Sequence, residues 1–244
     1  MTFFLKISTA ALMMIFLLFN PVLAAMSVYP MEVSVDTKGT SQIKLISKSD
    51  EVQFVKITLK KIINPGTSSE KEVIADESNA DEVAVVPAKI ALAAGTERVV
   101  RIVSLLPPEK ETTWRAYFES VDEREFNDNG ELNNSVKKSA TVGVNIIWGA
   151  LIHVLPITHD PALSYKTSTG EILNSGNVRV PIKEIGVCKV NGQCVWSKVI
   201  KTIYPDMVNS LSGVVFHPGS DYRARYMDET QNRIREIKIN ANNS

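Results

Sequence analysis

The sequence has 244 residues, which is enough for one large domain or for two domains of about a hundred residues each, and we expect two. Its 27 lysine and arginine residues balance its 27 aspartate and glutamate residues. This balance argues against nucleic acid or an anionic membrane surface as a partner of the whole molecule, so any charged site is expected to be local.

The first 25 residues have the pattern of a secretory signal peptide. Lys6 precedes an apolar run over residues 7–19, and cleavage is expected after Ala24 or Ala25. The run is shorter than a membrane span of about 20 residues, and no second run approaches that length. We therefore expect an exported mature chain that is not inserted in a membrane.

Alternating apolar residues predict a series of strands before residue 150, without a helical pattern of useful length. Polar loops are expected over residues 67–81 and 122–135. About seven strands at these spacings predict a β-sandwich. The expected strands are 27–36, 41–48, 52–63, 82–87, 89–92, 96–103 and 113–119.

One further stretch, residues 136–155, predicts an unusually long strand. Ala140, Val142, Val144 and Ile146 form one apolar face with period two, whereas a usual strand has about five or six residues. Such a strand has spare edge, and its small and β-branched side chains suit a narrow groove in a partner. The alternative is an ordinary buried strand of an immunoglobulin-like sandwich.

A second, smaller all-β unit is expected after the long strand. We place the N-terminal domain at residues 26–152 and the C-terminal domain at 153–244, with no Gly/Ser linker between them, so they should meet at a fairly fixed angle with a cleft between them. The expected strands of the second unit are 163–167, 172–173, 178–190, 193–203, 214–216, 222–227 and 234–239.

The two cysteines, Cys188 and Cys194, flank an Asn191-Gly192 pair that favours a type I′ turn. In an exported protein this spacing predicts a structural disulfide across a hairpin. A redox or metal role is the alternative, but the sequence has no Cys-x-x-Cys, and its three histidines form no ligand cluster with the cysteines by spacing.

The sequence contains no nucleophile elbow, phosphate-binding loop, zinc-binding His-Glu-x-x-His or dinucleotide fingerprint. The isolated histidines are expected to be structural. We therefore expect no enzymatic activity, no cofactor and no metal.

Three longer phrases stand out in the sequence: Ile-Ala-Leu-Ala-Ala-Gly-Thr-Glu-Arg-Val-Val-Arg-Ile at 90–102, the proline-rich step at 105–111, and Trp-Arg-Ala-Tyr-Phe-Glu at 114–119. Together with shorter phrases at 55–57, 60–67, 144–147 and 176–179, they resemble the periplasmic pilus chaperones, and most of all the alternate family that serves colonisation-factor-type fimbriae. The resemblance implies two immunoglobulin-like domains set in an L, and a periplasmic chaperone that holds fimbrial subunits and delivers them to an outer-membrane usher.

In this interpretation Ala140, Val142, Val144 and Ile146 belong to a strand donated to the subunit, which lacks the last strand of its own sandwich. Better-known chaperones of the larger family anchor the subunit's terminal carboxylate with an arginine and a lysine. Those positions fall on Glu32 and Asn145 here, and neither side chain is a cation.

Strand pairing predicts another anchor, with Arg115 as the primary cation and Lys60 as a weaker second one. The alternative is that Arg115 packs on Tyr117 or pairs with Glu119. For the whole protein, the leading hypothesis is the assembly chaperone. The alternatives are a fimbrial structural subunit or adhesin, and an exported hydrolase without a recognisable nucleophile or metal set.

Overall fold

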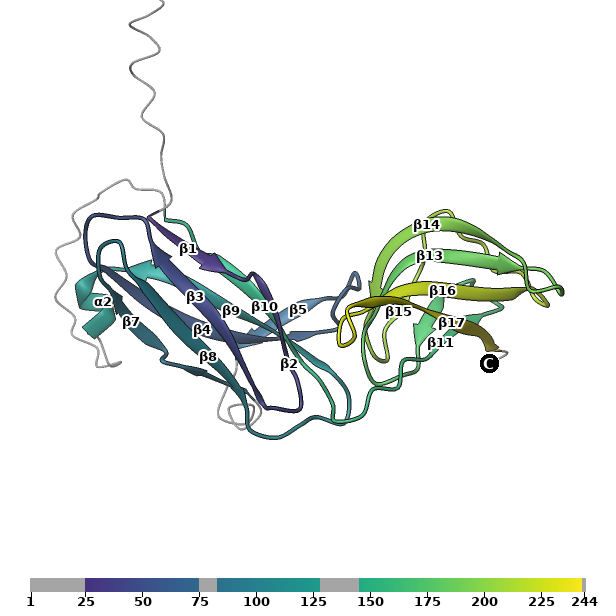
Figure 1. The fold of residues 1–244 in the computed structure, drawn as a ribbon, viewed down its shortest axis with the longest axis horizontal. Helices are drawn as coiled ribbons and strands as arrows, with labels where there is room; N and C mark the ends of the chain where they lie inside the picture. The colour runs from purple at the N-terminus through teal and green to yellow at the C-terminus, as the bar shows by residue number, and fades with distance from the viewer. Residues whose placement is uncertain (1–24, 75–82, 128–144, 243–244) are drawn as a thin grey trace, which may run out of the picture.

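The computed structural model describes residues 25–74, 83–127 and 145–242. Residues 1–24 of the expected signal peptide lie outside this part of the chain, and so do Ala140, Val142 and Val144 of the expected donor strand. Figure 1 shows two β-rich halves that meet at an open angle. No helix within the described residues is long and apolar enough to cross a membrane.

The N-terminal half consists of two sheets packed around one core. The first has the order β1 (Met26–Tyr29), β3 (Thr40–Ser47), β8 (Glu97–Ser104), β6 (Val83–Val86). The second has the order β2 (Glu32–Val35), β10 (Trp148–Val154), β9 (Thr112–Val121), β4 (Gln53–Ile63), β5 (Lys71–Ile74), with β7 (Lys89–Leu92) also paired to β4. The core between the sheets includes the fully buried Trp114, Phe118, Ile43, Leu45 and Ile102.

The expected first strand is two strands. β1 pairs with β3 in the first sheet, whereas β2 pairs in parallel with β10 in the second. Pro30 lies between them and has no N–H with which to continue the β1 ladder. The chain therefore changes sheets here, and this places Glu32 beside β10.

The prediction of polar loops over 67–81 and 122–135 is wrong in two places. Residues 71–74 form β5, which pairs antiparallel with residues 60–63 of β4. Residues 123–127 form a short helix, α2 (Glu123–Asn127), in which Phe126 N–H donates to the Asp122 carbonyl at 2.9 Å. Both segments are too short and too polar for their periodicity to have been visible.

Within the described residues, the strand expected over 136–155 is shorter than predicted. β10 begins at Trp148, and residues 145–147 before it lie in no strand. Ile146 is 42% exposed. At its other end β10 extends to Val154, which still belongs to the N-terminal core.

The C-terminal half is one strongly curved seven-stranded sheet that folds over its own core. The expected strand at 214–216 is not formed, although Phe216 is buried, and a two-residue strand at 208–209 was not predicted. The sheet order is β14 (Cys194–Ile203), β13 (Val180–Cys188), β16 (Asp221–Asp228), β17 (Arg233–Asn242), β11 (Leu163–Lys166), β12 (Ile172–Asn174), β15 (Val208–Asn209).

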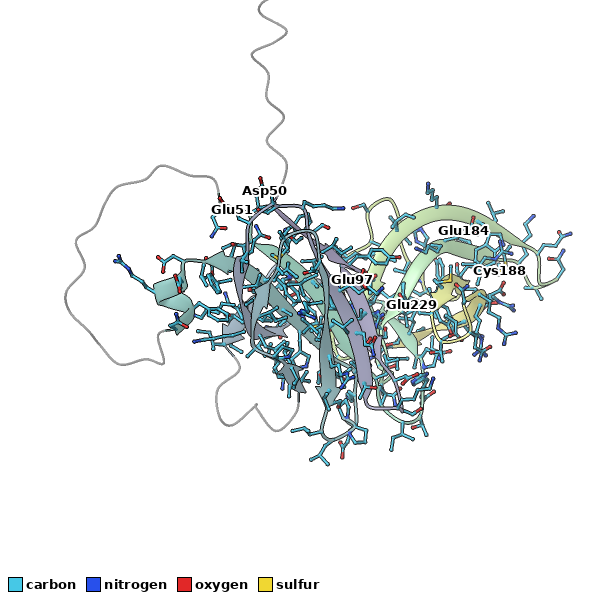
Figure 2. The ribbon with its side chains drawn as sticks, turned by 60° about the vertical axis from the view of Figure 1, so that its left-hand side comes forward. Asp50, Glu51, Glu97, Glu184, Cys188 and Glu229 are labelled. Carbon is cyan, nitrogen blue, oxygen red and sulfur yellow. A yellow bond between two sulfur atoms is a disulfide. The ribbon has the colours of Figure 1, made fainter. Side chains whose placement is uncertain are left out.

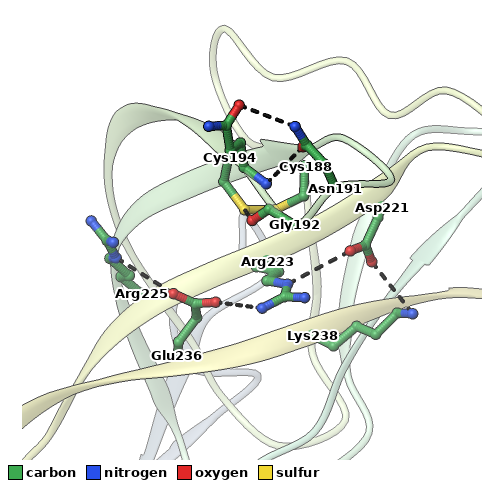
Figure 3. The surroundings of a disulfide bond; sticks show 10 residues. Cys188, Asn191, Gly192, Cys194, Asp221, Arg223, Arg225, Glu236 and Lys238 are labelled. Carbon is green, nitrogen blue, oxygen red and sulfur yellow. Dashed lines mark hydrogen bonds and ion pairs between the residues drawn. A yellow bond between two sulfur atoms is a disulfide. The ribbon is translucent and has the colours of Figure 1, made fainter.

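The predicted disulfide between Cys188 and Cys194 is confirmed at the end of the β13–β14 hairpin. Figure 3 shows the chain of charged side chains that lies near it, in which Arg223 contacts both Glu236 and Asp221. In Figure 2, Cys188 lies on the side of the C-terminal half that faces away from the N-terminal half. The bond is therefore a local staple of one hairpin.

Taken together, these features confirm the predicted all-β fold of two immunoglobulin-like domains in an L, with two separate sheets around the N-terminal core and one curved sheet around the C-terminal core.

Candidate functional site

Arg179 joins the two halves through a buried ion pair. Its side chain is 5% exposed, and its Nη1 donates to Glu111 Oε1 at 2.6 Å, while its backbone N–H donates to Glu111 Oε2 at 2.8 Å. Its Nη2 contacts Glu229, which is labelled in Figure 2, and donates to Ser34 Oγ at 3.2 Å. Because Glu111 and Ser34 belong to the N-terminal half, this network fixes the angle between the domains.

His153 extends the network along β10. Its Nε2 lies 3.0 Å from Glu32 Oε1 and its Nδ1 lies 3.1 Å from Glu111 Oε1. Burial lowers the pKa of His153, but the carboxylates of Glu111 and Glu32 raise it by a larger amount, so the net pKa lies above its usual 6.5. Burial raises the pKa of Glu111, but His153 and Arg179 lower it more, and the net pKa lies below its usual 4.5.

These two opposite pKa shifts predict how stability depends on pH. The stability due to His153 is complete below its usual pKa of 6.5 and is lost as the pH rises through its raised pKa, whereas that due to Glu111 is complete above 4.5 and is lost as the pH falls through its lowered pKa. The free energy of unfolding should therefore fall as the pH rises above about 6.5. The His153→Asn variant should lack this decline in urea unfolding, whereas the His159→Asn variant, which replaces an exposed histidine, should retain it.

A second polar cluster lies on the same face of the sheet. In β9 the side chains of Trp114, Ala116 and Phe118 enter the core. Because strand side chains alternate, Arg115 and Tyr117 point to the opposite face, the one that carries His153. Arg115 pairs with Leu151 of β10, two residues before His153, so the cluster begins about 7 Å from the domain junction.

Arg115 and Lys60 are brought together as predicted. They are directly opposite each other across the β4–β9 ladder, and both contact the carboxylate of Glu72 on β5. Tyr117 Oη donates to both oxygens of Glu72, with distances of 2.8 Å to Oε1 and 2.7 Å to Oε2. Lys60 Nζ lies 3.6 Å from Glu72 Oε2. We call these four residues, Lys60, Glu72, Arg115 and Tyr117, the carboxylate cluster.

Gly149 makes room for this cluster. A Cβ atom at Gly149 would lie 3.1 Å from Arg115 Cδ and 3.3 Å from Tyr117 Cε1, closer than ordinary packing allows. With a larger residue at position 149, the arginine and tyrosine side chains would have to shift by a few tenths of an ångström. The four residues of the cluster come from β4, β5 and β9, and Gly149 of β10 packs against them.

The structure brings some of the predicted site residues into this region and not others. Of the two alternatives for Arg115, the interaction with Tyr117 is present and the pairing with Glu119 is not, and its carboxylate partner is Glu72. Glu32 lies in the domain junction, 3.9 Å from Arg179, and Asn145 Nδ2 donates to the Ser120 carbonyl at 3.2 Å. Sequence reasoning missed Glu72 because it assigned this residue to a loop.

The chemistry that this arrangement offers is recognition of a carboxylate. A guanidinium, an ammonium and a phenol hydroxyl converge on one pair of oxygen atoms, and such charge-assisted hydrogen bonds are roughly twice as strong as neutral ones. Within the described part of the chain, no three histidine, cysteine, aspartate or glutamate side chains are placed to hold a metal ion.

Two curated proteins similar to this chain are both fimbrial proteins of Escherichia coli. No protein-family model matches it. It is 34% identical over 203 residues to a CFA/I fimbrial protein of Escherichia coli that is named as a subunit, and the match covers 78% of this chain and 82% of that protein. It is 36% identical over 187 residues to a similarly named CS1 fimbrial protein of Escherichia coli, with 73% and 76% covered.

Solved structures that are similar to this chain also come from fimbrial systems. The class 5 fimbrial chaperone CfaA has a TM-score of 0.71 and 29% identity, with 88% of this chain and 98% of that chain covered. A chain from a chaperone–tip adhesin complex of CFA/I fimbriae has a TM-score of 0.70 and 29% identity, with 88% and 99% covered. The archaic Csu chaperone–tip subunit complex, at 10% identity and a TM-score of 0.52, shares the fold alone.

Proposed function

Because the chain belongs to the chaperones of colonisation-factor fimbriae, we propose that it captures fimbrial subunits in the periplasm by donor-strand complementation and delivers them to an outer-membrane usher. The observation that carries this proposal is the position of the carboxylate cluster. It lies on the face of the sheet opposite the core, about 7 Å from the domain junction, and directly beyond the point where the expected donor segment enters β10.

The donor segment is residues 140–146, which precede β10 in the chain. Ala140, Val142, Val144 and Ile146 would fill the groove of a subunit that lacks its last strand, and the backbone would pair with its two open edges. Each fully buried valine or isoleucine contributes about 1.5–3 kcal/mol, so four small apolar residues suffice to hold a subunit while remaining replaceable by a better-fitting strand.

The subunit's terminal carboxylate would then lie in the cluster. From Ile146 to Leu151, the neighbour of Arg115, the chain can span about 16 Å if extended, so a subunit strand paired with the donor segment can end beside Arg115. Arg115 provides the fork of N–H donors that fits a carboxylate, and Lys60 adds a second positive charge.

Replacing Arg115 with alanine should weaken subunit capture by about 1.5–3 kcal/mol, since one charge-assisted contact is lost. Affinity would be measured with the purified subunit that co-purifies with the wild-type protein from periplasmic extract. Arg101→Ala, an exposed arginine on the other sheet, is the matched control and should bind as the wild type does. Equal affinities for Arg115→Ala and Arg101→Ala would remove the anchor from Arg115.

A fimbrial structural subunit or adhesin remains the second candidate, and the names of the two Escherichia coli relatives favour it. The structural match with the class 5 chaperone argues against it, because this match covers nearly the whole of the solved chaperone chain. Mass spectrometry of sheared, washed fimbriae separates the two, because a structural subunit is part of the fibre. A chaperone should occur only in the periplasmic fraction, bound to a different protein.

A further inference from the structure

The carboxylate cluster is already filled by a carboxylate of this chain. We propose that Glu72 is an internal competitor that occupies the site of the subunit's terminal carboxylate and leaves it when a subunit is captured. This inference rests on the proposed function, because it assigns a regulatory residue to the same anchor site.

The contacts of Glu72 are those that a terminal carboxylate would make. Its Oε1 accepts from Arg115 and Tyr117, and its Oε2 accepts from Tyr117 and lies near Lys60. The three side chains thus all contact one negative group. Burial raises the pKa of Glu72, but the hydrogen bond from Tyr117 and the charge of Arg115 together lower it by a larger amount. The net pKa lies below its usual 4.5, which keeps the carboxylate ionised.

Two carboxylates cannot share this site at no cost. Like charges a few ångströms apart disfavour each other's ionised form, so a second carboxylate that contacted Arg115 beside Glu72 would be repelled by it. A subunit carboxylate must therefore either displace Glu72 or bind outside the cluster. Displacement leaves the fold intact, because the backbone of Glu72 pairs with Ile62 in the β4–β5 ladder and only its side chain has to rotate.

The same hairpin is held at its turn by the C-terminal half. Lys201 Nζ donates to the Gly66 carbonyl at 2.9 Å, and a Cβ at Gly66 would lie 3.1 Å from the Tyr204 ring. The β4–β5 hairpin is therefore fixed relative to the C-terminal half. With the strand fixed, the Glu72 carboxylate returns to the same place whenever the site is empty, which keeps Arg115 and Lys60 paired in the free protein.

The test uses N-acetylglycine, a small probe that presents a terminal carboxylate next to a peptide group. Its dissociation constant would be obtained by NMR from the Arg115 side-chain N–H signal in the full mature chain. Glu72→Gln should bind it about tenfold more tightly than the wild type, since the variant keeps the size of the side chain and loses only its charge. Glu119→Gln, which removes a charge about 13 Å along the same strand face, should bind as the wild type does.

Equal or weaker binding by Glu72→Gln, or no saturable binding by it, would overturn the proposal and make Glu72 a group that positions Arg115. This outcome is separate from failure of the anchor itself. If the anchor is wrong, Arg115→Ala captures whole subunits as well as the wild type does, whatever Glu72→Gln shows with the small probe.

Discussion

Replacing Arg179 with alanine should lower the free energy of unfolding by about 3–5 kcal/mol, because it removes the guanidinium that pairs with a buried carboxylate. Glu111 has a side chain that is fully buried, and the variant loses the guanidinium hydrogen bond while it keeps the one from the backbone N–H of residue 179 and the contact with His153. The variant should also lose the fixed angle between the domains. Urea unfolding followed by tryptophan fluorescence measures the first effect, and small-angle scattering measures the second.

A double variant separates loss of charge pairing from loss of packing. Replacing both members of a buried pair with apolar residues is often neutral in stability, so Arg179→Met/Glu111→Met should recover most of what Arg179→Ala loses. A single Lys110→Ala variant removes a different interdomain contact, an exposed ion pair with Asp206, and should cost at most about 1 kcal/mol. A loss as small as this for Arg179→Ala would show that the junction does not depend on Arg179.

Replacing Val142 with aspartate should abolish subunit capture. In the proposed complex this side chain enters an apolar groove, where an ionised carboxylate costs several kcal/mol unless it is neutralised. Capture would be measured as the yield of subunit that co-purifies with the chaperone from periplasmic extract, with circular dichroism as the check on folding.

Thr141→Asp is the matched control for Val142→Asp. Because strand side chains alternate, residue 141 would face away from the groove that residue 142 fills. The same charge placed one residue earlier should therefore leave capture close to the wild-type yield. If both variants capture subunit normally while folded, residues 140–146 are not the donor strand.

The sequence predicted the strands that have strong alternation and failed where the signal was short or depended on distant residues. β4 and β9 are long and amphipathic, so their existence and pairing could be inferred. β5 has only four residues, two of them charged, and it exists because it pairs with the end of β4. A two-residue strand such as β15 depends entirely on its partner β12.

The candidate site was predictable to the same extent. Pairing of β4 with β9 brought Arg115 and Lys60 together correctly, because register follows from the hydrophobic alternation of each strand. The carboxylate of Glu72 could not be placed without β5. Likewise, nothing local to Arg179, Glu111 or His153 indicated a shared junction, since these residues come from distant parts of the chain.

Amide hydrogen exchange of residues 138–147 tests donor-strand complementation most directly. The chaperone would be measured alone and in the complex with the subunit that co-purifies with it. Strand addition pairs the donor backbone with both edges of the subunit groove, so consecutive amides of this segment should exchange much more slowly in the complex than in the free protein. An intact complex in which residues 138–147 exchange at the same rate as in the free chaperone would contradict donation of this strand.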